Sequence, residues 1–79
     1  MKQPKVKVYS TSTCPWCHKV KDFLKDKGIK FDDIDVGADP KAANEMVEKS
    51  GQMGVPVTDI GGTVIVGFDK KAIEKALAG

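Results

Sequence analysis

The sequence contains no arginine, and its 13 lysines are nearly matched by 11 aspartates and glutamates, which gives a formal net charge of +2. Both signs of charge are mixed along the chain, whereas a domain that binds nucleic acid usually carries a clear basic excess. We therefore expect no nucleic-acid partner.

Long apolar runs are also missing. Residues 1–7 are polar and basic, and only the short apolar-rich run 6–9 follows, so no stretch has the length of a signal peptide. No segment approaches the ~18 apolar residues that a membrane span requires. We expect a cytoplasmic protein that has no membrane partner.

The chain is short and carries few metal ligands. Its 79 residues allow one modest core, so we expect a single domain over residues 1–79 and a monomer. The two cysteines and the one histidine, His18, do not supply four well-placed tetrahedral ligands for zinc. We therefore expect no bound metal or other cofactor.

The two cysteines form the stretch Cys14-Pro15-Trp16-Cys17, where an alternating, strand-like run gives way to a run with helical periodicity. In a reducing cytosol a lone C-x-x-C is more often catalytic or metal-binding than structural. Cysteines three positions apart at a helix start can reach disulfide range, and the helix N-terminus favours a thiolate at Cys14. Pro15 suits the first helical position. We interpret the stretch as a dithiol redox site; the alternative is a buried pair of inert cysteines.

Trp16 lies between the cysteines, where a side chain at the start of a helix should project outward. Tryptophan gives a large contact area at a small entropy cost, so we interpret it as a contact surface for substrates. The alternative is that it packs over the first helical turn.

Apolar periodicity, capping residues and turn signals divide the rest of the chain into strands and helices in the order β-α-β-α-β-β-α. The hairpin turn is Gly61-Gly62, and Asp39 and Asp69 are the expected helix caps. This order predicts an α/β protein of thioredoxin-like architecture, in which a four-stranded mixed sheet has helices on both faces. The expected strands are residues 5–9, 29–36, 55–60 and 63–66, and the expected helices are residues 15–27, 40–50 and 70–78.

Three stretches together resemble the glutaredoxin family, and most of all the short glutaredoxin-like proteins of the YruB family. They are residues 6–17, which end in Cys14-Pro15-Trp16-Cys17, residues 52–56, and residues 66–69. The resemblance implies a thiol-disulfide oxidoreductase that takes part in electron transfer and cell redox homeostasis. Cys14 would be the nucleophile and Cys17 the resolving cysteine.

The resemblance also implies a substrate-binding region around the dithiol, to which Pro15, Trp16 and Gln52 would contribute. In this family the bond equivalent to Val55-Pro56 is cis and lies beside the cysteines, and the Val55 backbone would pair with a bound peptide. An ordinary trans proline is the alternative. Gly67 and Asp69 would hold the γ-glutamyl end of glutathione, unless Asp69 is only a helix cap.

Two positions depart from the glutathione-binding pattern. Val66 stands where the family's motif has its first glycine, and Thr11 stands where users of glutathione often have lysine. We expect the substrates to be disulfide-containing proteins or small disulfides, with glutathione a candidate co-substrate but a poor electron donor. The upstream reductase would be linked either to glutathione or to thioredoxin reductase.

Other functions remain open at this point. The chain could be a dedicated electron donor to one partner, such as ribonucleotide reductase, or carry an iron–sulfur cluster between subunits. His18 completes the string C-x-x-C-H, which is also the attachment signature of c-type haem. Attachment of haem would require export and a mostly helical chain, whereas this sequence has no signal peptide and four strand-like segments.

Overall fold

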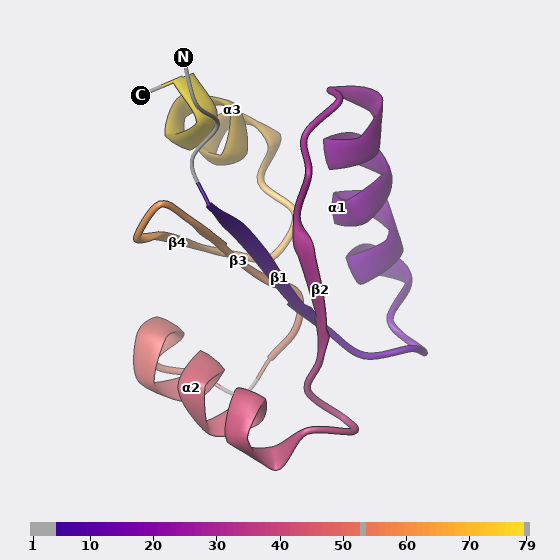
Figure 1. The fold of residues 1–79 in the computed structure, drawn as a ribbon, viewed down its shortest axis with the longest axis vertical. Helices are drawn as coiled ribbons and strands as arrows, with labels where there is room; N and C mark the ends of the chain where they lie inside the picture. Colours follow the sequence, from indigo (N-terminus) through magenta and orange to yellow (C-terminus); the bar gives the residue numbers. More distant parts are fainter. Residues whose placement is uncertain (1–4, 53, 79) are drawn as a thin grey trace.

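The computed structural model describes residues 5–52 and 54–78. Met53, which falls between the expected helix 40–50 and the expected strand 55–60, lies outside the described residues. The order of elements is the one expected from the sequence (Figure 1). The strands are β1 (Val6–Ser10), β2 (Asp32–Asp35), β3 (Val57–Ile60) and β4 (Thr63–Val66), and the helices are α1 (Pro15–Asp26), α2 (Pro40–Ser50) and α3 (Lys70–Ala78).

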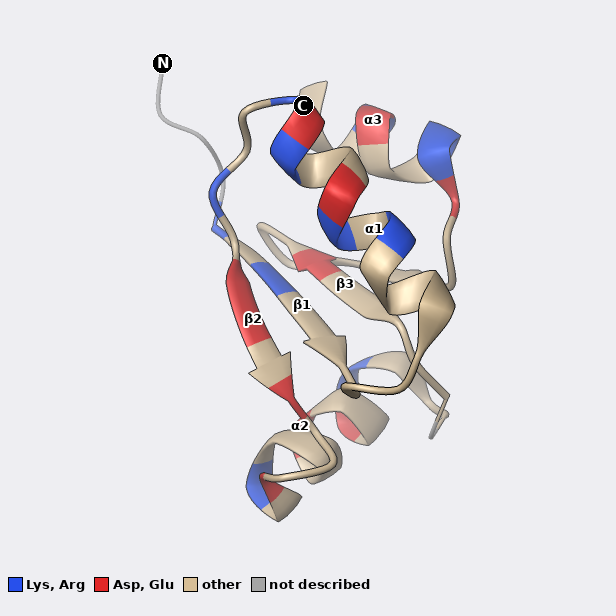
Figure 2. Ribbon diagram, turned by 90° about the vertical axis from the view of Figure 1, so that its right-hand side faces the viewer, with Lys and Arg blue, Asp and Glu red and all other residues tan. Residues whose placement is uncertain are grey.

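The strands form one mixed sheet in the order β2-β1-β3-β4. β1 pairs with β2 in parallel and with β3 antiparallel, and β3 pairs antiparallel with β4. Helices α1 and α3 lie together on one face of the sheet, and α2 lies on the other (Figure 2). The expected thioredoxin-like architecture is confirmed.

The helix boundaries follow the residues that predicted them. Pro15 opens α1 and Pro40 opens α2, each at the position where a missing N–H costs nothing. The Asp39 carboxylate accepts hydrogen bonds from two N–H groups in the first turn of α2, and the Asp69 carboxylate accepts one in α3. Gly51 ends α2 with a φ of 75°, a conformation that residues with a Cβ rarely adopt.

Two strands are shorter than the sequence predicted. β2 begins at Asp32 rather than at Ile29, because the Ile29 N–H donates to the Leu24 carbonyl at the end of α1. β3 begins at Val57 rather than at Val55, because Pro56 has no N–H to give to the sheet.

The core is divided unequally between the two faces of the sheet. The face under α1 and α3 buries seven apolar residues, whereas the face under α2 buries three. None of the described helices is long and apolar enough to cross a membrane. The larger cluster contains Val6, Val8, Val20, Leu24, Ile60, Ile65 and Ile73, and the smaller one contains Tyr9, Met46 and Val57.

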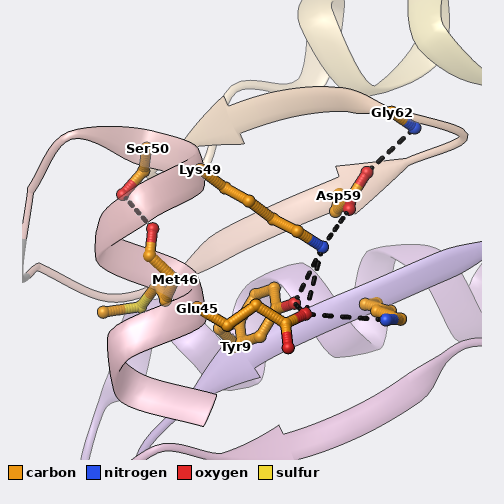
Figure 3. Close-up of polar contacts among 8 residues, drawn as sticks. Tyr9, Glu45, Met46, Lys49, Ser50, Asp59 and Gly62 are labelled. Carbon is orange, nitrogen blue, oxygen red and sulfur yellow. Dashed lines mark hydrogen bonds and ion pairs between the residues drawn. The ribbon is translucent and has the colours of Figure 1, made fainter. Parts of the chain in front are cut away.

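A polar network adds to the contact between α2 and the sheet (Figure 3). The hydroxyl of Tyr9 in β1 donates a hydrogen bond to Glu45 and accepts one of 3.1 Å from Lys49 Nζ. Lys49 also lies 2.7 Å from Asp59 Oδ2 in β3 and 3.2 Å from Glu45 Oε1. Lys7 completes the network at 3.6 Å from Glu45.

Candidate active site

Cys14 is the residue that caps the N-terminus of α1. It has an extended backbone, with φ −91° and ψ 112°, and its sulfur accepts the N–H of Cys17 at 3.2 Å. This N–H belongs to the first turn, so it has no partner within the helix. Negative charge on Sγ would gain from both that hydrogen bond and the helix dipole. The cap position therefore gives the Cys14 sulfur a hydrogen-bond donor, and the side chain is half-buried.

Cys17 lies one turn into α1 in a different environment. It is a free thiol with no exposed surface, on the face of α1 that packs against the sheet. Burial, followed by the contact with Cys14, raises the pKa of Cys17 to about 11. Cys17 therefore stays protonated at neutral pH, and Cys14 is the sulfur that remains to attack a disulfide.

A pocket opens beside the dithiol. It is lined by Trp16, Val55, Pro56, Gly67 and Phe68, with a volume of about 320 Å³. The Val55-Pro56 peptide bond is cis, as the family resemblance implied. The Val55 carbonyl oxygen lies 4.0 Å from Cys14 Sγ, so the residue before the proline is beside the capping sulfur. A segment bound in this pocket would lie against Cys14.

The side chains of the pocket come from three parts of the chain. Trp16 is 55% exposed, so the outward orientation expected from the sequence is confirmed. Its ring centroid lies 6.4 Å from that of Phe68, in the connection between β4 and α3. The Gly67 N–H donates to the Pro56 carbonyl at 2.9 Å and thereby joins this connection to the proline.

The structure does not bring every predicted site residue to the pocket. Gln52 is exposed in the turn after α2, and Pro15 is exposed at the start of α1; neither lines the pocket. The Asp69 carboxylate caps α3, with Oδ1 3.1 Å from the Ala72 N–H. The capping role is thus confirmed, while the roles of these three residues in binding stay predictions.

Phe68 is the pocket residue that sequence reasoning did not assign. In the sequence it falls within the stretch 66–69, between the expected strand 63–66 and the expected helix 70–78. An aromatic residue directly after a glycine with positive φ, here 78° at Gly67, is the signal that could have found it. The glycine turns the chain so that the next side chain faces back over the first turn of α1.

No group of three or more His, Cys, Asp or Glu residues that could hold a metal ion occurs among residues 5–52 and 54–78. His18, which completes the C-x-x-C-H string, is exposed on α1. The two departures from the glutathione-binding pattern both lie near the site. Val66 is 46% exposed at the end of β4, and Thr11 is half-buried in the loop before Cys14.

Comparison with known proteins agrees with this site. The family model described as glutaredoxin matches residues 6–65. The chain is 51% identical over 72 residues, 91% of its length, to an uncharacterized glutaredoxin-like 8.6 kDa protein in the rubredoxin operon of Clostridium pasteurianum, 96% of which it covers.

Two solved structures extend the comparison. The glutaredoxin of Archaeoglobus fulgidus matches with a TM-score of 0.88 and 27% identity, over 96% of this chain and 88% of that one. NrdH-redoxin of Escherichia coli, a glutaredoxin-like protein with a thioredoxin-like activity profile, matches with a TM-score of 0.81 and 27% identity, over 90% and 92%. The chain belongs to the glutaredoxin family of thiol oxidoreductases.

Proposed function

We propose that this protein reduces disulfide bonds in proteins and small molecules, with Cys14 as nucleophile and Cys17 as resolving thiol. One observation carries the proposal: the two sulfurs of one dithiol have opposite environments. Cys14 caps a helix beside an open pocket, while Cys17 is buried and protonated.

The reaction would proceed in two exchanges. The Cys14 thiolate attacks one sulfur of the substrate disulfide; the Cys14–substrate bond forms, the substrate S–S bond breaks, and the first sulfur leaves as a thiolate that takes a proton from water. Cys17 then loses its proton to the departing sulfur and attacks Cys14 Sγ, which releases the second thiol. The substrate gains two electrons and two protons, and the protein is left with a Cys14–Cys17 disulfide.

A reductant must reopen that disulfide, and we propose that glutathione is the poorer of two donors. Val66 adds a side chain where close approach of glutathione needs bare backbone, and Thr11 offers no cation for its glycyl carboxylate. Loss of one charge-assisted hydrogen bond costs about 1.5–3 kcal/mol, or roughly tenfold or more in affinity. A dithiol reductase of the thioredoxin reductase type would not need these contacts.

The similarity to NrdH-redoxin, whose activity profile is thioredoxin-like, also supports thioredoxin reductase as the better electron donor. It also supports a second candidate function, in which the chain supplies electrons to a single enzyme such as a ribonucleotide reductase. Stoichiometric oxidation by small disulfides, without turnover, would favour this second function. In either case we propose that the protein is a monomer and that it acts in the cytosol, where thiols are kept reduced.

A coupled assay tests the proposal. NADPH is supplied with either glutathione and glutathione reductase or thioredoxin reductase alone, and oxidation of NADPH is followed with a model disulfide. We expect turnover with thioredoxin reductase, and we expect the KM for glutathione to be much higher than the KM for thioredoxin reductase. The double variant Val66→Gly and Thr11→Lys should lower the KM for glutathione about tenfold, while Thr63→Gly, at the far end of β4, should leave it unchanged.

The controls separate the two claims in this proposal. Cys14→Ser should abolish turnover with both donors, and Cys17→Ser should accumulate mixed disulfides. Equal activity in both single variants would refute the assignment of the cysteines. Efficient turnover of the unmodified protein with glutathione, or no gain in the double variant, would refute the choice of donor only.

A further inference from the structure

Two aromatic rings that line the pocket each hold a lysine. Lys19 Nζ lies 4.3 Å from the centroid of the Trp16 ring. Lys70 Nζ lies 5.6 Å from the centroid of the Phe68 ring and 5.9 Å from that of Phe23. At these distances an ammonium group is attracted to the face of a ring, so both charges are held close to the pocket.

Neither lysine forms an ion pair with a carboxylate within residues 5–52 and 54–78. The ion pairs between described residues are made by Lys7, Lys21, Lys27 and Lys49, and Lys19 and Lys70 take part in none of them. Asp69, next to Lys70 in the sequence, has Oδ1 bonded to the N–H of Ala72. Basic residues on α1 and at the start of α3 lie on the same side of the molecule (Figure 2). The pocket thus combines an apolar lining with a cationic rim.

We propose that the preferred substrates are protein disulfides in extended, acidic segments. An apolar side chain next to the partner's cysteine would enter the pocket that Trp16 and Phe68 line, and carboxylates of the partner would pair with Lys19 and Lys70. The proposal rests on the proposed function, because it describes the partner of the same dithiol. It adds the chemistry by which one disulfide is chosen over another.

The pocket favours a protein segment over glutathione as the source of these carboxylates. The pocket has a volume of about 320 Å³, and its lining includes the apolar residues Trp16, Phe68, Val55 and Pro56. This size and lining suit a bulky apolar side chain. Glutathione has no such side chain. Since exposed charges are screened beyond about 8 Å at physiological salt, the two lysines would act on carboxylates close to the reacting cysteine.

Three disulfide-linked peptides test the inference. They share a central cysteine with a neighbouring phenylalanine and differ in flanks that are acidic, neutral or basic. We expect the highest kcat/KM for the acidic peptide and a loss of this preference as salt is raised. The variant Lys19→Gln with Lys70→Gln should lower the ratio of acidic to neutral kcat/KM roughly three- to tenfold.

Charge inversion and a matched control sharpen the result. Lys19→Glu with Lys70→Glu should reverse the preference, so that the basic peptide is reduced fastest. Lys41→Gln with Lys75→Gln removes the same charge from exposed positions that do not line the pocket, and should keep the acidic preference. Equal rates for the three peptides, or an acidic preference that survives inversion, would overturn the inference.

A binding experiment keeps the inference separate from the proposed function. Peptides with serine in place of cysteine cannot react, and their binding can be followed by the fluorescence of Trp16, the only tryptophan in the chain. Tighter binding of the acidic peptide would support an acidic-peptide site at this pocket even if no reductase activity is found. Active enzyme with no such preference overturns the inference and leaves the function standing. The inference would also be overturned if the variant Lys19→Gln with Lys70→Gln had a higher KM for glutathione but an unchanged preference among the three peptides.

Discussion

Cys14 and Cys17 show how three positions along a helix can separate the chemistry of two identical side chains. The capping sulfur accepts the Cys17 N–H and is half-buried, whereas the Cys17 sulfur has no exposed surface. The sequence predicted this difference from the C-x-x-C spacing and Pro15, because both place the first cysteine at a helix start. It did not predict how completely Cys17 is buried, which depends on packing against the sheet.

Alkylation measures the difference at the residue scale. In Cys14→Ser the remaining thiol is Cys17, whose pKa is raised to about 11 mainly by burial, so its thiolate fraction lies below that of a free thiol at every lower pH. Burial is the largest cause of the raised pKa and remains in this variant, so we expect iodoacetamide at pH 7.5 to react with it much more slowly than with a free cysteine. The same variant unfolded in urea should react normally. Equal rates in the folded and unfolded protein would contradict the assignment of Cys17 as the protonated thiol.

At the scale of elements, the helices were predicted more closely than the strands. A helix end is marked by local residues, such as Asp39-Pro40 before α2 and Gly51 after it. A strand end depends on its neighbours, so the sequence could not show that Ile29 bonds back to α1. The polar network under α2 was missed for the same reason. Tyr9 is 36 positions from Glu45, and in the sequence it had the pattern of an apolar strand residue.

Asp69 offers a test that separates helix capping from binding of glutathione. Asp69→Ala should destabilise the protein by about 1 kcal/mol, because an N–H of α3 loses its acceptor. Asp39→Ala should cost about as much at α2, on the other face of the sheet. Thermal unfolding measures both losses.

The replacement Asp69→Ser keeps a capping oxygen and removes the charge. It should restore most of the stability. If the KM for glutathione rises in Asp69→Ser and not in Asp39→Ala, the carboxylate also contributes to binding. An unchanged KM in Asp69→Ser would show that Asp69 is a helix cap only.

At the scale of the whole molecule, the two layers are held by different forces. The face under α1 and α3 buries the larger apolar cluster, and burial of apolar surface is nearly independent of pH. The face under α2 buries the smaller cluster of Tyr9, Met46 and Val57, with partly buried apolar residues packed around it, and it also carries the charged network. We therefore expect α2 to be the layer whose attachment depends on pH.

Glu45 should set the acid limit of stability. The hydrogen bond from Tyr9, followed by that from Lys49, lowers the pKa of Glu45 from 4.5 to about 2. A lowered pKa stabilises the fold above the unfolded value, and this contribution is lost as the pH falls from about 4.5 to about 2. In Glu45→Gln, urea unfolding at pH 7 should show lower stability than the unmodified protein, and the two curves should converge towards pH 2. Glu48→Gln removes the same charge from α2 without touching Tyr9 or Lys49, and should keep the acid dependence of the unmodified protein.

Hydrogen exchange at pH 3 should then show α2 opening before α1 and α3, because protonation of Glu45 weakens the network that joins α2 to the sheet. Simultaneous opening of all three helices would mean that the network does not hold α2 to the sheet.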